Sequence, residues 1–249
     1  MTERPVTLPA DKITSYRDRG FVHIPGILTG AEAAHFYDAA LAFSKSPRPT
    51  DYGGAVFTQL VNVWRDSGVL RELTLHKTVT AVAAKLAGVP LRLWHDQILI
   101  KQPRNNAATE FHQDQPYWPH AHSPNPISAW IALCDVPVEK GCMTFLPGTQ
   151  TRTDLAAQNL GDDKSLFALA PDLTWHERIT VPLRAGDCTF HHGRCAHMAT
   201  PNCTDDPRVA HIVIFMDATA TYTGAAHIIT DPLGLSVGDR LDGELFPMV

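Results

Sequence analysis

The sequence has no long hydrophobic run, no block of basic residues and no closely spaced cysteine pair. Its 249 residues contain no apolar stretch long enough for a membrane span, and no apolar signal segment follows the first residues. With 21 Lys and Arg against 26 Asp and Glu, the formal net charge is −5. This charge carries no pattern that indicates nucleic acid or an anionic lipid surface. The composition therefore predicts a globular protein that acts on neither membranes nor nucleic acids.

The five cysteines are an odd number and none forms a Cys-x-x-Cys pair. Such a set fits neither a disulfide framework nor a zinc knuckle. We therefore expect a protein of the reducing cytoplasm. The hydrophobic share of 44% and the charged share of 19% are typical of a soluble domain with a sizeable core.

The first third of the chain reads as helical with one strand. We expect a helix over 11–19 ending at Gly20 and a strand over 21–25. Thr29 and Glu32 have the form of a capping box at the start of another helix. A further helix is predicted over 71–86, and Gly88 ends it.

From Leu91 onward, short runs of strand-forming residues alternate with turn residues, which is typical of an all-β sandwich or barrel. No repeat or low-complexity tract divides the chain, and we expect one domain over residues 1–249. Residues 1–90 form a mostly helical frame in this interpretation, and the insert at about 151–176 is a lid, a binding loop or an ordinary insertion. The expected strands are 91–101, 109–113, 127–136, 143–146, 178–181, 187–191 and 209–217.

His112 and Asp114 stand two positions apart in the run Glu110–Trp118. On a β-strand, residues i and i+2 point to the same face, so both side chains can bind one ion. The pair alone is weak evidence, because an isolated His-x-Asp arises by chance and such a His is more often a surface or core residue. The candidates for a third ligand are His191, His192, His197, His211 and His227.

A turn-rich segment separates His197 from Arg208. If it folds as a hairpin near Asn202–Cys203, His197 and Arg208 face each other across neighbouring strands. His197 then completes a two-His-one-carboxylate set with open metal positions, which suits non-haem Fe(II) oxygenases. In that arrangement Arg208 is a bidentate anchor for an acidic cosubstrate.

An ordered series of motifs extends this pattern along the chain. It comprises Leu91–Gln97, Lys101, His112-Gln113-Asp114, Ala129-Trp130, Gly141-Cys142, Leu146–Thr149, Gly186-Asp187, and His197 followed eleven residues later by Arg208. Through this series the chain resembles the phytanoyl-CoA dioxygenase-like family of Fe(II)/2-oxoglutarate-dependent oxygenases. The resemblance implies a mainly β fold with flanking helices, in which residues 91–249 form a double-stranded β-helix, the jelly-roll barrel of cupin-like proteins.

The resemblance also implies roles for single residues. His112, Asp114 and His197 match the iron ligands, Arg208 matches the anchor of the 2-oxoglutarate C5 carboxylate, and Trp130 matches a residue of the cosubstrate pocket. Fe(II), 2-oxoglutarate and O2 are the implied cofactor and cosubstrates. The implied reaction hydroxylates, desaturates or cyclises at a C–H bond of a small organic substrate and releases succinate and CO2.

Other assignments depend on the resemblance more loosely. Gln97 or His95, which share a strand face, is expected near the 2-oxoglutarate. Gln113 and Trp118 are candidate substrate contacts, although strict alternation turns Gln113 away from His112. For His120, His211 and the remaining histidines, a loop or strand-surface position is the expectation.

Two other classes of protein compete with the oxygenase reading. A cupin-type metalloenzyme without 2-oxoglutarate would use the same three ligands but would not need Arg208 or Trp130. A non-enzymatic jelly-roll binding module would need none of these residues. The sequence shows no cluster of Lys and Arg for the phosphates of CoA, so a small organic substrate is favoured over an acyl-CoA. It does not specify the oligomeric state.

Overall fold

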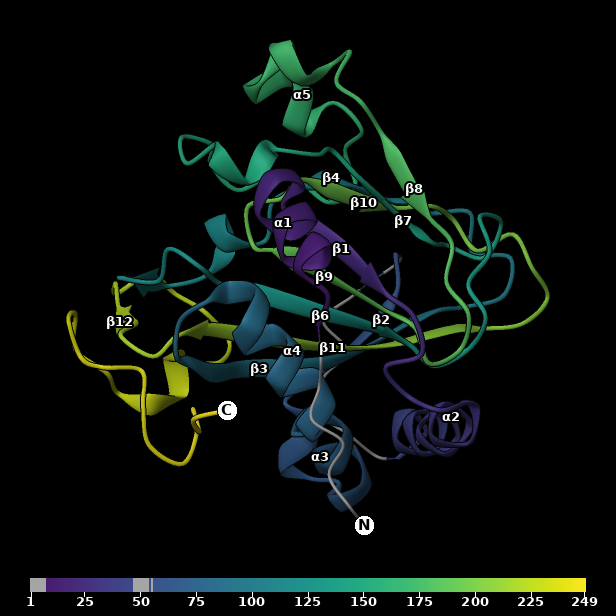
Figure 1. Ribbon diagram of the computed structural model, residues 1–249, viewed down its shortest axis with the longest axis horizontal. Coiled ribbons are helices and arrows are strands. Elements are labelled where there is room, and N and C mark those ends of the chain that lie inside the picture. The colour runs from purple at the N-terminus through teal and green to yellow at the C-terminus, as the bar shows by residue number, and fades with distance from the viewer. Residues whose placement is uncertain (1–7, 47–53, 55) are drawn as a thin grey trace.

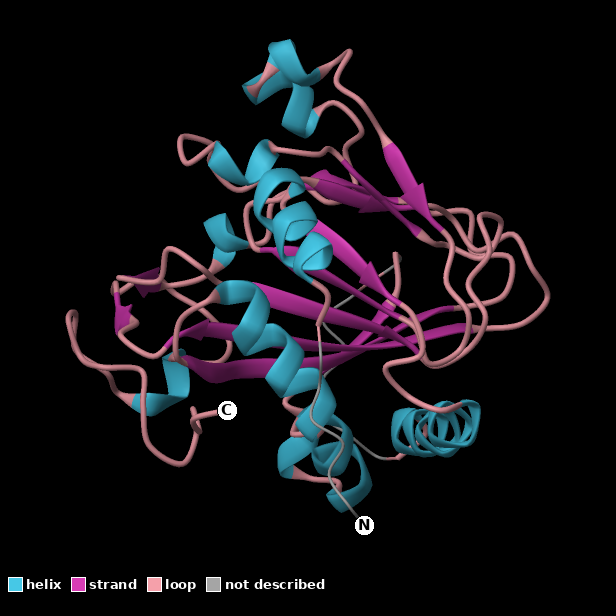
Figure 2. Cartoon of the chain, in the orientation of Figure 1, coloured by secondary structure: helices cyan, strands magenta, loops and turns pink. Residues whose placement is uncertain are grey.

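Two antiparallel β-sheets face each other at the centre of the protein, and helices cover the outer side of the larger sheet (Figures 1 and 2). The computed structural model describes residues 8–46, 54 and 56–249. The larger sheet has the strand order β1-β9-β6-β11-β3-β2, and the smaller sheet has the order β4-β10-β7-β8. The mainly β fold with flanking helices that the sequence predicts is confirmed, as two facing sheets of jelly-roll type.

The strands lie at β1 Phe21–Ile24, β2 Thr58–Val61, β3 Leu91–Lys101, β4 Thr109–His112, β5 His120–Ala121, β6 Ile127–Ala132, β7 Met143–Phe145, β8 Ile179–Val181, β9 Cys188–His192, β10 His197–Ala199, β11 Arg208–Asp217 and β12 Thr221–Tyr222. The helices lie at α1 Ala10–Arg19, α2 Gly30–Ser44, α3 Gly68–Thr74, α4 Lys77–Ala87 and α5 Ser165–Leu169.

The N-terminal region does more than frame the core, because two of its strands join the large sheet. β1 pairs with β9 at one edge, and β2, which the sequence did not predict, pairs with β3 at the other edge. The insert at about 151–176 carries α5, whose Leu166 packs with Phe111 of β4 in a small separate core. No helix in the described ranges is long and apolar enough to cross a membrane.

Local capping signals are confirmed where the sequence shows them. The Thr29 side chain accepts a hydrogen bond from the Glu32 backbone, and the Glu32 carboxylate accepts one from the Thr29 backbone, so the capping box is complete. Gly20 follows α1 with φ 79°, a left-handed conformation that a residue with a Cβ atom adopts at a cost.

The helical region predicted over about 71–86 is confirmed, except that it is not continuous. The region forms two helices, α3 and α4, which are separated by Leu75 and His76. The His76 backbone is extended, with φ −61° and ψ 121°, and this ends the first helix before the second begins. The apolar periodicity continues through the break because both helices pack on the same outer face of the large sheet.

The inner face of the large sheet carries the polar residues, and its rows are set by strand register. Arg208 on β11 lies opposite Lys101 on β3, and Ile212 lies between Gln97 and Trp130. Because side chains alternate along a strand, Arg208 and Ile212 point to the same face.

The predicted hairpin that joins His197 to Arg208 is wrong. β10 pairs with β4 and β7 in the small sheet, whereas β11 pairs with β3 and β6 in the large sheet. The two residues therefore belong to facing sheets rather than to neighbouring strands. The turn-rich segment crosses from one sheet to the other, which a local sequence pattern does not reveal.

Candidate metal centre

His112, Asp114 and His197 come together between the two sheets. His112 ends β4 and lies in register with His197, the first residue of β10. Their Nε2 atoms lie 3.4 and 3.8 Å from Oδ1 of Asp114. One ligand atom from each of the three residues lies within 4.8 Å of the others, a spacing that can hold one metal ion.

Asp114 does not lie on the strand. The strand ends at His112, and Asp114 has the helical angles φ −74° and ψ −44° that start the 3-10 helix Gln115–Tyr117. The bend rather than strand alternation turns the carboxylate toward the two imidazoles. Strand alternation was expected to bring His112 and Asp114 to the same face. The strand ends at His112, however, and the bend after it brings the two side chains together.

Both imidazole rings are oriented by backbone carbonyls. The Nδ1 of His112 donates to the Glu110 carbonyl at 2.7 Å, and the Nδ1 of His197 donates to the Cys195 carbonyl at 3.0 Å. In each case the acceptor is the residue two positions before the histidine. These bonds fix the tautomer, so each Nε2 turns its lone pair toward Asp114, as a metal ligand requires.

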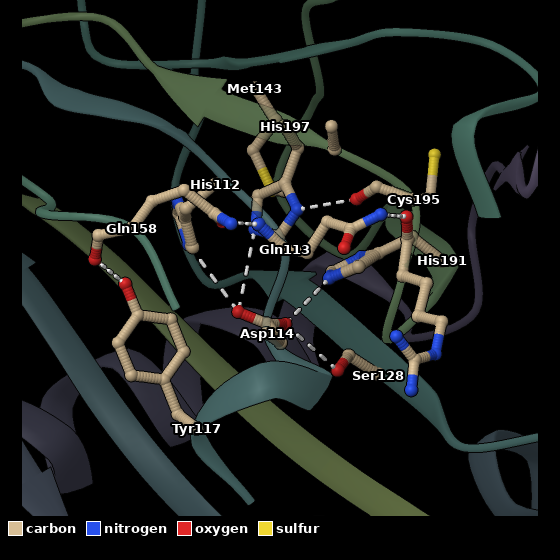
Figure 3. A network of polar contacts seen from close by, with 12 residues as sticks. His112, Gln113, Asp114, Tyr117, Ser128, Met143, Gln158, His191, Cys195 and His197 are labelled. Carbon is tan, nitrogen blue, oxygen red and sulfur yellow. Dashed lines mark hydrogen bonds and ion pairs between the residues drawn. The ribbon is translucent and has the colours of Figure 1, made fainter. Parts of the chain in front are cut away.

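The second oxygen of the Asp114 carboxylate has partners of its own. Nε2 of His191 lies 3.4 Å from Oδ2, and Oγ of Ser128 lies 3.5 Å from it (Figure 3). These two contacts hold Oδ2, while Oδ1 faces His112 and His197. Sequence reasoning did not assign His191 a role, although the alternation of His191 and His192 allows one of them to face the interior.

The charge states at the centre are those that metal ligands need. Burial alone would raise the pKa of Asp114, but the surrounding His197, His112 and His191 hold it well below its usual range. Burial and the neighbouring His112 lower the pKa of His197 to about 3. The Asp114 carboxylate and the neutral His197 imidazole are ready to bind a metal ion without first losing protons.

Arg208 is buried and forms no salt bridge with a carboxylate of the described residues. Its guanidinium carbon lies 5.2 Å from the ring centre of Trp130, and its Nη1 makes one long contact of 3.4 Å with the Leu99 carbonyl. Its Nε has no hydrogen-bond partner in the described chain. Burial lowers the pKa of Arg208 to about 10, so it remains a cation at neutral pH.

Lys101 adds a second buried cation beside Arg208. Its Nζ donates to the carbonyls of Ala107, Ala199 and Thr200 at 2.9–3.2 Å. Burial, followed by the repulsion from Arg208, lowers the pKa of Lys101 to about 7. The surroundings of Arg208 therefore favour an anionic ligand.

A cavity of about 460 Å³ joins the triad to Arg208. Among the described residues that line it, Arg208 is the one Lys or Arg and Asp114 is the one carboxylate. The lining residues are Phe57, Gln59, Val61, His95, Gln97, Leu99, Thr109, His112, Asp114, Tyr117, Trp118, Trp130, Met143, Leu160, His191, His197, Ala199, Arg208, Ile212, Ile214, Ala226, His227 and Ile228.

The predicted secondary contacts fall in different places. Gln97 and Trp118 line the cavity, and the Gln97 side chain accepts a hydrogen bond from Gln59. Gln113 is buried outside it, where its amide donates to the carbonyls of Thr149, Arg152 and Arg194. Gln113 thus holds loops together in this structure, and its contact with a substrate stays a prediction.

Three histidines that the sequence placed on the surface are partly or fully buried. His211 is fully buried and contacts Thr74 and Asp96 behind the large sheet. The ring nitrogens of His120 are buried as well, and His227 lines the cavity. Strand β11 is covered on both faces, so the polar residue within its apolar run is not a sign of exposure.

Comparison with known proteins agrees with this geometry. Residues 16–210 match the family described as Phytanoyl-CoA dioxygenase (PhyH), and the chain belongs to that family. A Mus musculus protein named Phytanoyl-CoA dioxygenase domain-containing protein 1 is 29% identical over 160 residues, which are 61% of this chain and 54% of the mouse protein. The chain thus spans about half the length of such curated relatives.

Two solved structures are similar over nearly the whole chain. The non-heme alpha ketoglutarate dependent carbocyclase SnoK from nogalamycin biosynthesis is 37% identical, with a TM-score of 0.86 over 99% of this chain and 100% of that one. The epimerase SnoN, in complex with Fe3+, alpha ketoglutarate (2-oxoglutarate) and nogalamycin RO, is 36% identical, with a TM-score of 0.82 over 96% of this chain and 97% of that one.

Proposed function

We propose that this chain is a non-haem Fe(II)/2-oxoglutarate-dependent oxygenase that acts on a C–H bond of a small organic substrate. The observation that carries the proposal is one cavity bounded by a two-His-one-carboxylate triad and by a buried arginine. A metalloprotein that binds no acidic cosubstrate has no use for an unpaired buried cation at this place, since burying a charge is costly.

His112, Asp114 and His197 would hold the iron. The donor set of two imidazoles and one carboxylate suits Fe(II) and leaves coordination positions open for other ligands. When bound, iron, 2-oxoglutarate and O2 would supply the oxidation of the C–H bond, with 2-oxoglutarate converted to succinate and CO2. The protein contributes orientation: backbone carbonyls fix both rings, and His191 and Ser128 hold the distal oxygen of Asp114.

Arg208 would pair with the far carboxylate of 2-oxoglutarate. A guanidinium that makes one weak contact has donors available for a bidentate pair. Trp130 lies against the guanidinium and restricts its position. Lys101 is the register partner of Arg208 and adds positive charge when it is protonated. Gln97, on the neighbouring strand, is the proposed side contact to the cosubstrate.

The reaction and the substrate are proposed from two similar solved structures. SnoK is named a carbocyclase and SnoN an epimerase, and both belong to nogalamycin biosynthesis. We infer that this chain acts on a related natural-product intermediate, and that ring closure or epimerisation stands beside hydroxylation among its outcomes. Tyr117 and Trp118 at the cavity wall would pack against such a substrate and exclude water.

The test measures succinate formation and cosubstrate binding on the same protein. Purified protein is loaded anaerobically with Fe(II) and 2-oxoglutarate and then exposed to O2, with wild type beside His112→Ala and Arg208→Ala. We expect 2-oxoglutarate binding and slow succinate release by wild type, and the loss of succinate in both variants. If iron-loaded wild type does not bind 2-oxoglutarate, the proposal fails and a cupin-type metalloenzyme or a binding module takes its place.

A further inference from the structure

A β-bulge in β3 places two neighbouring side chains on the inner face of the large sheet. Ile214 of β11 lies opposite His95, whereas the next residue, Phe215, lies opposite Leu93, so Trp94 is an extra residue in β3. Leu93 packs in the hydrophobic cluster between the large sheet and the helices. Trp94 packs in the cluster on the inner face of the sheet, and His95 lines the cavity. Bulges re-aim side chains and are common next to active sites.

The bulge lies at the end of the sheet away from Arg208. Lys101, the register partner of Arg208, lies six positions after His95, which is about 20 Å of strand. His95, Ile214 and Ser128 form one row across three strands, and Ser128 contacts Asp114. Two strand spacings, about 10 Å, separate the backbone of His95 from that of Ser128. This end of the cavity is therefore beside the triad but remote from the proposed cosubstrate anchor.

Two imidazoles in this part of the cavity offer complementary hydrogen-bonding atoms. Nδ1 of His95 donates to the Asp96 carbonyl at 3.3 Å, so its Nε2 is an acceptor. Nδ1 of His227 accepts from the Ile229 backbone at 3.2 Å, so its Nε2 carries a proton and is a donor. The ring centres lie 6.1 Å apart. No described residue forms a hydrogen bond with either Nε2, which leaves one acceptor and one donor for a ligand.

The electrostatics of this region exclude an anion as its natural ligand. Burial lowers the pKa of His95 to about 3 and that of His227 to about 4, so both rings are neutral at physiological pH. Among the described lining residues, the one Lys or Arg is Arg208, at the other end. A phosphate or carboxylate here would lose its hydration and would meet no Lys or Arg side chain of the cavity lining, which is costly. A hydroxyl group, which both donates and accepts, fits both imidazoles.

An aromatic wall completes the region. Trp118 lines the cavity, and its ring packs so close to Gly193 that a Cβ atom there would lie 2.7 Å from it. His120 packs edge-on against Trp94 with 4.3 Å between ring centres, and neither of its buried ring nitrogens has a hydrogen-bond partner in the described chain. Trp118 presents the planar surface to the cavity, with His120 and Trp94 behind the lining, and such a surface suits a cyclic substrate.

We propose that His95, Trp118, His227 and Ile228, together called the bulge lobe, bind a hydroxyl-bearing, non-anionic ring of the substrate. Nε2 of His95 accepts a hydrogen bond from the hydroxyl group, Nε2 of His227 donates one to a substrate oxygen, and Trp118 packs against the ring. The proposal rests on the proposed oxygenase function and adds the substrate class: an oxygenated cyclic molecule, not an acyl-CoA.

The test uses the holoprotein with Fe(II) and 2-oxoglutarate under anaerobic conditions. Calorimetry measures binding of two probes, nogalamycin RO and phytanoyl-CoA, to wild type, His95→Leu, His227→Leu and His95→Gln. His35→Leu, at an exposed position of α2, is the matched control. We expect nogalamycin RO to bind wild type and the control, and to bind each of the His95→Leu and His227→Leu variants at least tenfold more weakly. His95→Gln, whose amide oxygen replaces the acceptor, recovers part of the affinity.

The binding of 2-oxoglutarate to each variant, followed by the absorption of its iron complex, shows that the variant is folded. It also separates this proposal from the proposed function. Where 2-oxoglutarate binds, three results for nogalamycin RO overturn the bulge-lobe proposal and leave the oxygenase proposal standing. These are no binding to wild type, equal binding to wild type and both leucine variants, or weaker binding than that of phytanoyl-CoA. If 2-oxoglutarate itself does not bind wild type, the oxygenase proposal fails first.

Discussion

Replacing Arg208 by Met separates the cost of a buried cation from its use. In the absence of 2-oxoglutarate, Arg208 has no carboxylate partner among the described residues, and burial lowers its pKa from 12.5 to about 10. A shift of this size corresponds to a penalty of roughly 3 kcal/mol for keeping the charge inside the protein. Met retains much of the packing of the arginine stem against Trp130 without the charge.

The expected effect on stability therefore changes sign with the cosubstrate. Without 2-oxoglutarate, Arg208→Met should unfold at the same temperature as wild type or at a higher one. When 2-oxoglutarate is bound, the Arg208→Met variant lacks two charge-assisted hydrogen bonds to the cosubstrate that wild type makes. Each is worth about 1.5–3 kcal/mol. A total of roughly 3–6 kcal/mol corresponds to a rise in Kd of about 10² to 10⁴.

The assay is thermal unfolding of metal-loaded protein under anaerobic conditions, with and without 2-oxoglutarate. At a concentration of 100 times the wild-type Kd, the ligand stabilises wild type by about 2.7 kcal/mol and should stabilise Arg208→Met by at most about 0.4 kcal/mol. Arg184→Met, at an exposed position, is the control and should respond as wild type does. Equal stabilisation of Arg208→Met and wild type by 2-oxoglutarate would refute the reasoning.

Three further predictions concern the ligands and a buried carboxyl. Asp114→Ala should abolish stoichiometric Fe(II) binding in an equilibrium titration while the fold persists by circular dichroism; retained iron would contradict the assignment. His191→Leu removes one of two groups that hold Oδ2 of Asp114, so Fe(II) affinity measured against a chelator should fall about 10- to 100-fold. An unchanged affinity would show that Ser128 alone is enough to hold the carboxylate. Burial raises the pKa of Asp96 to about 7, so between pH 4 and 7 the folded state keeps a proton that the unfolded state has lost. Stability should fall across this window by up to ~1.4 kcal/mol per pH unit, and urea unfolding of Asp96→Asn should lack that slope.

The failed hairpin shows where local reasoning stops. The eleven-residue spacing of His197 and Arg208 is real, but it comes from a crossing between two sheets rather than from a turn within one. Both arrangements bring the residues to one cavity. The sequence pattern therefore named two residues that line one cavity, but the structure corrects the physical reason that brings them there.

Sequence alone determined the groups whose chemistry is specific: the pattern of His112, Asp114, His197 and Arg208, the alternation of β3 and β11, and the caps of the early helices. These features depend on residue type and on spacing along the chain. Tertiary structure alone decided the contact of His191 and Ser128 with Asp114, and the bulge that turns Trp94 and His95 inward together with His227. Such contacts join residues up to 132 positions apart, from His95 to His227. The pairing of strands and the packing of loops create them, and no local pattern in the sequence specifies either.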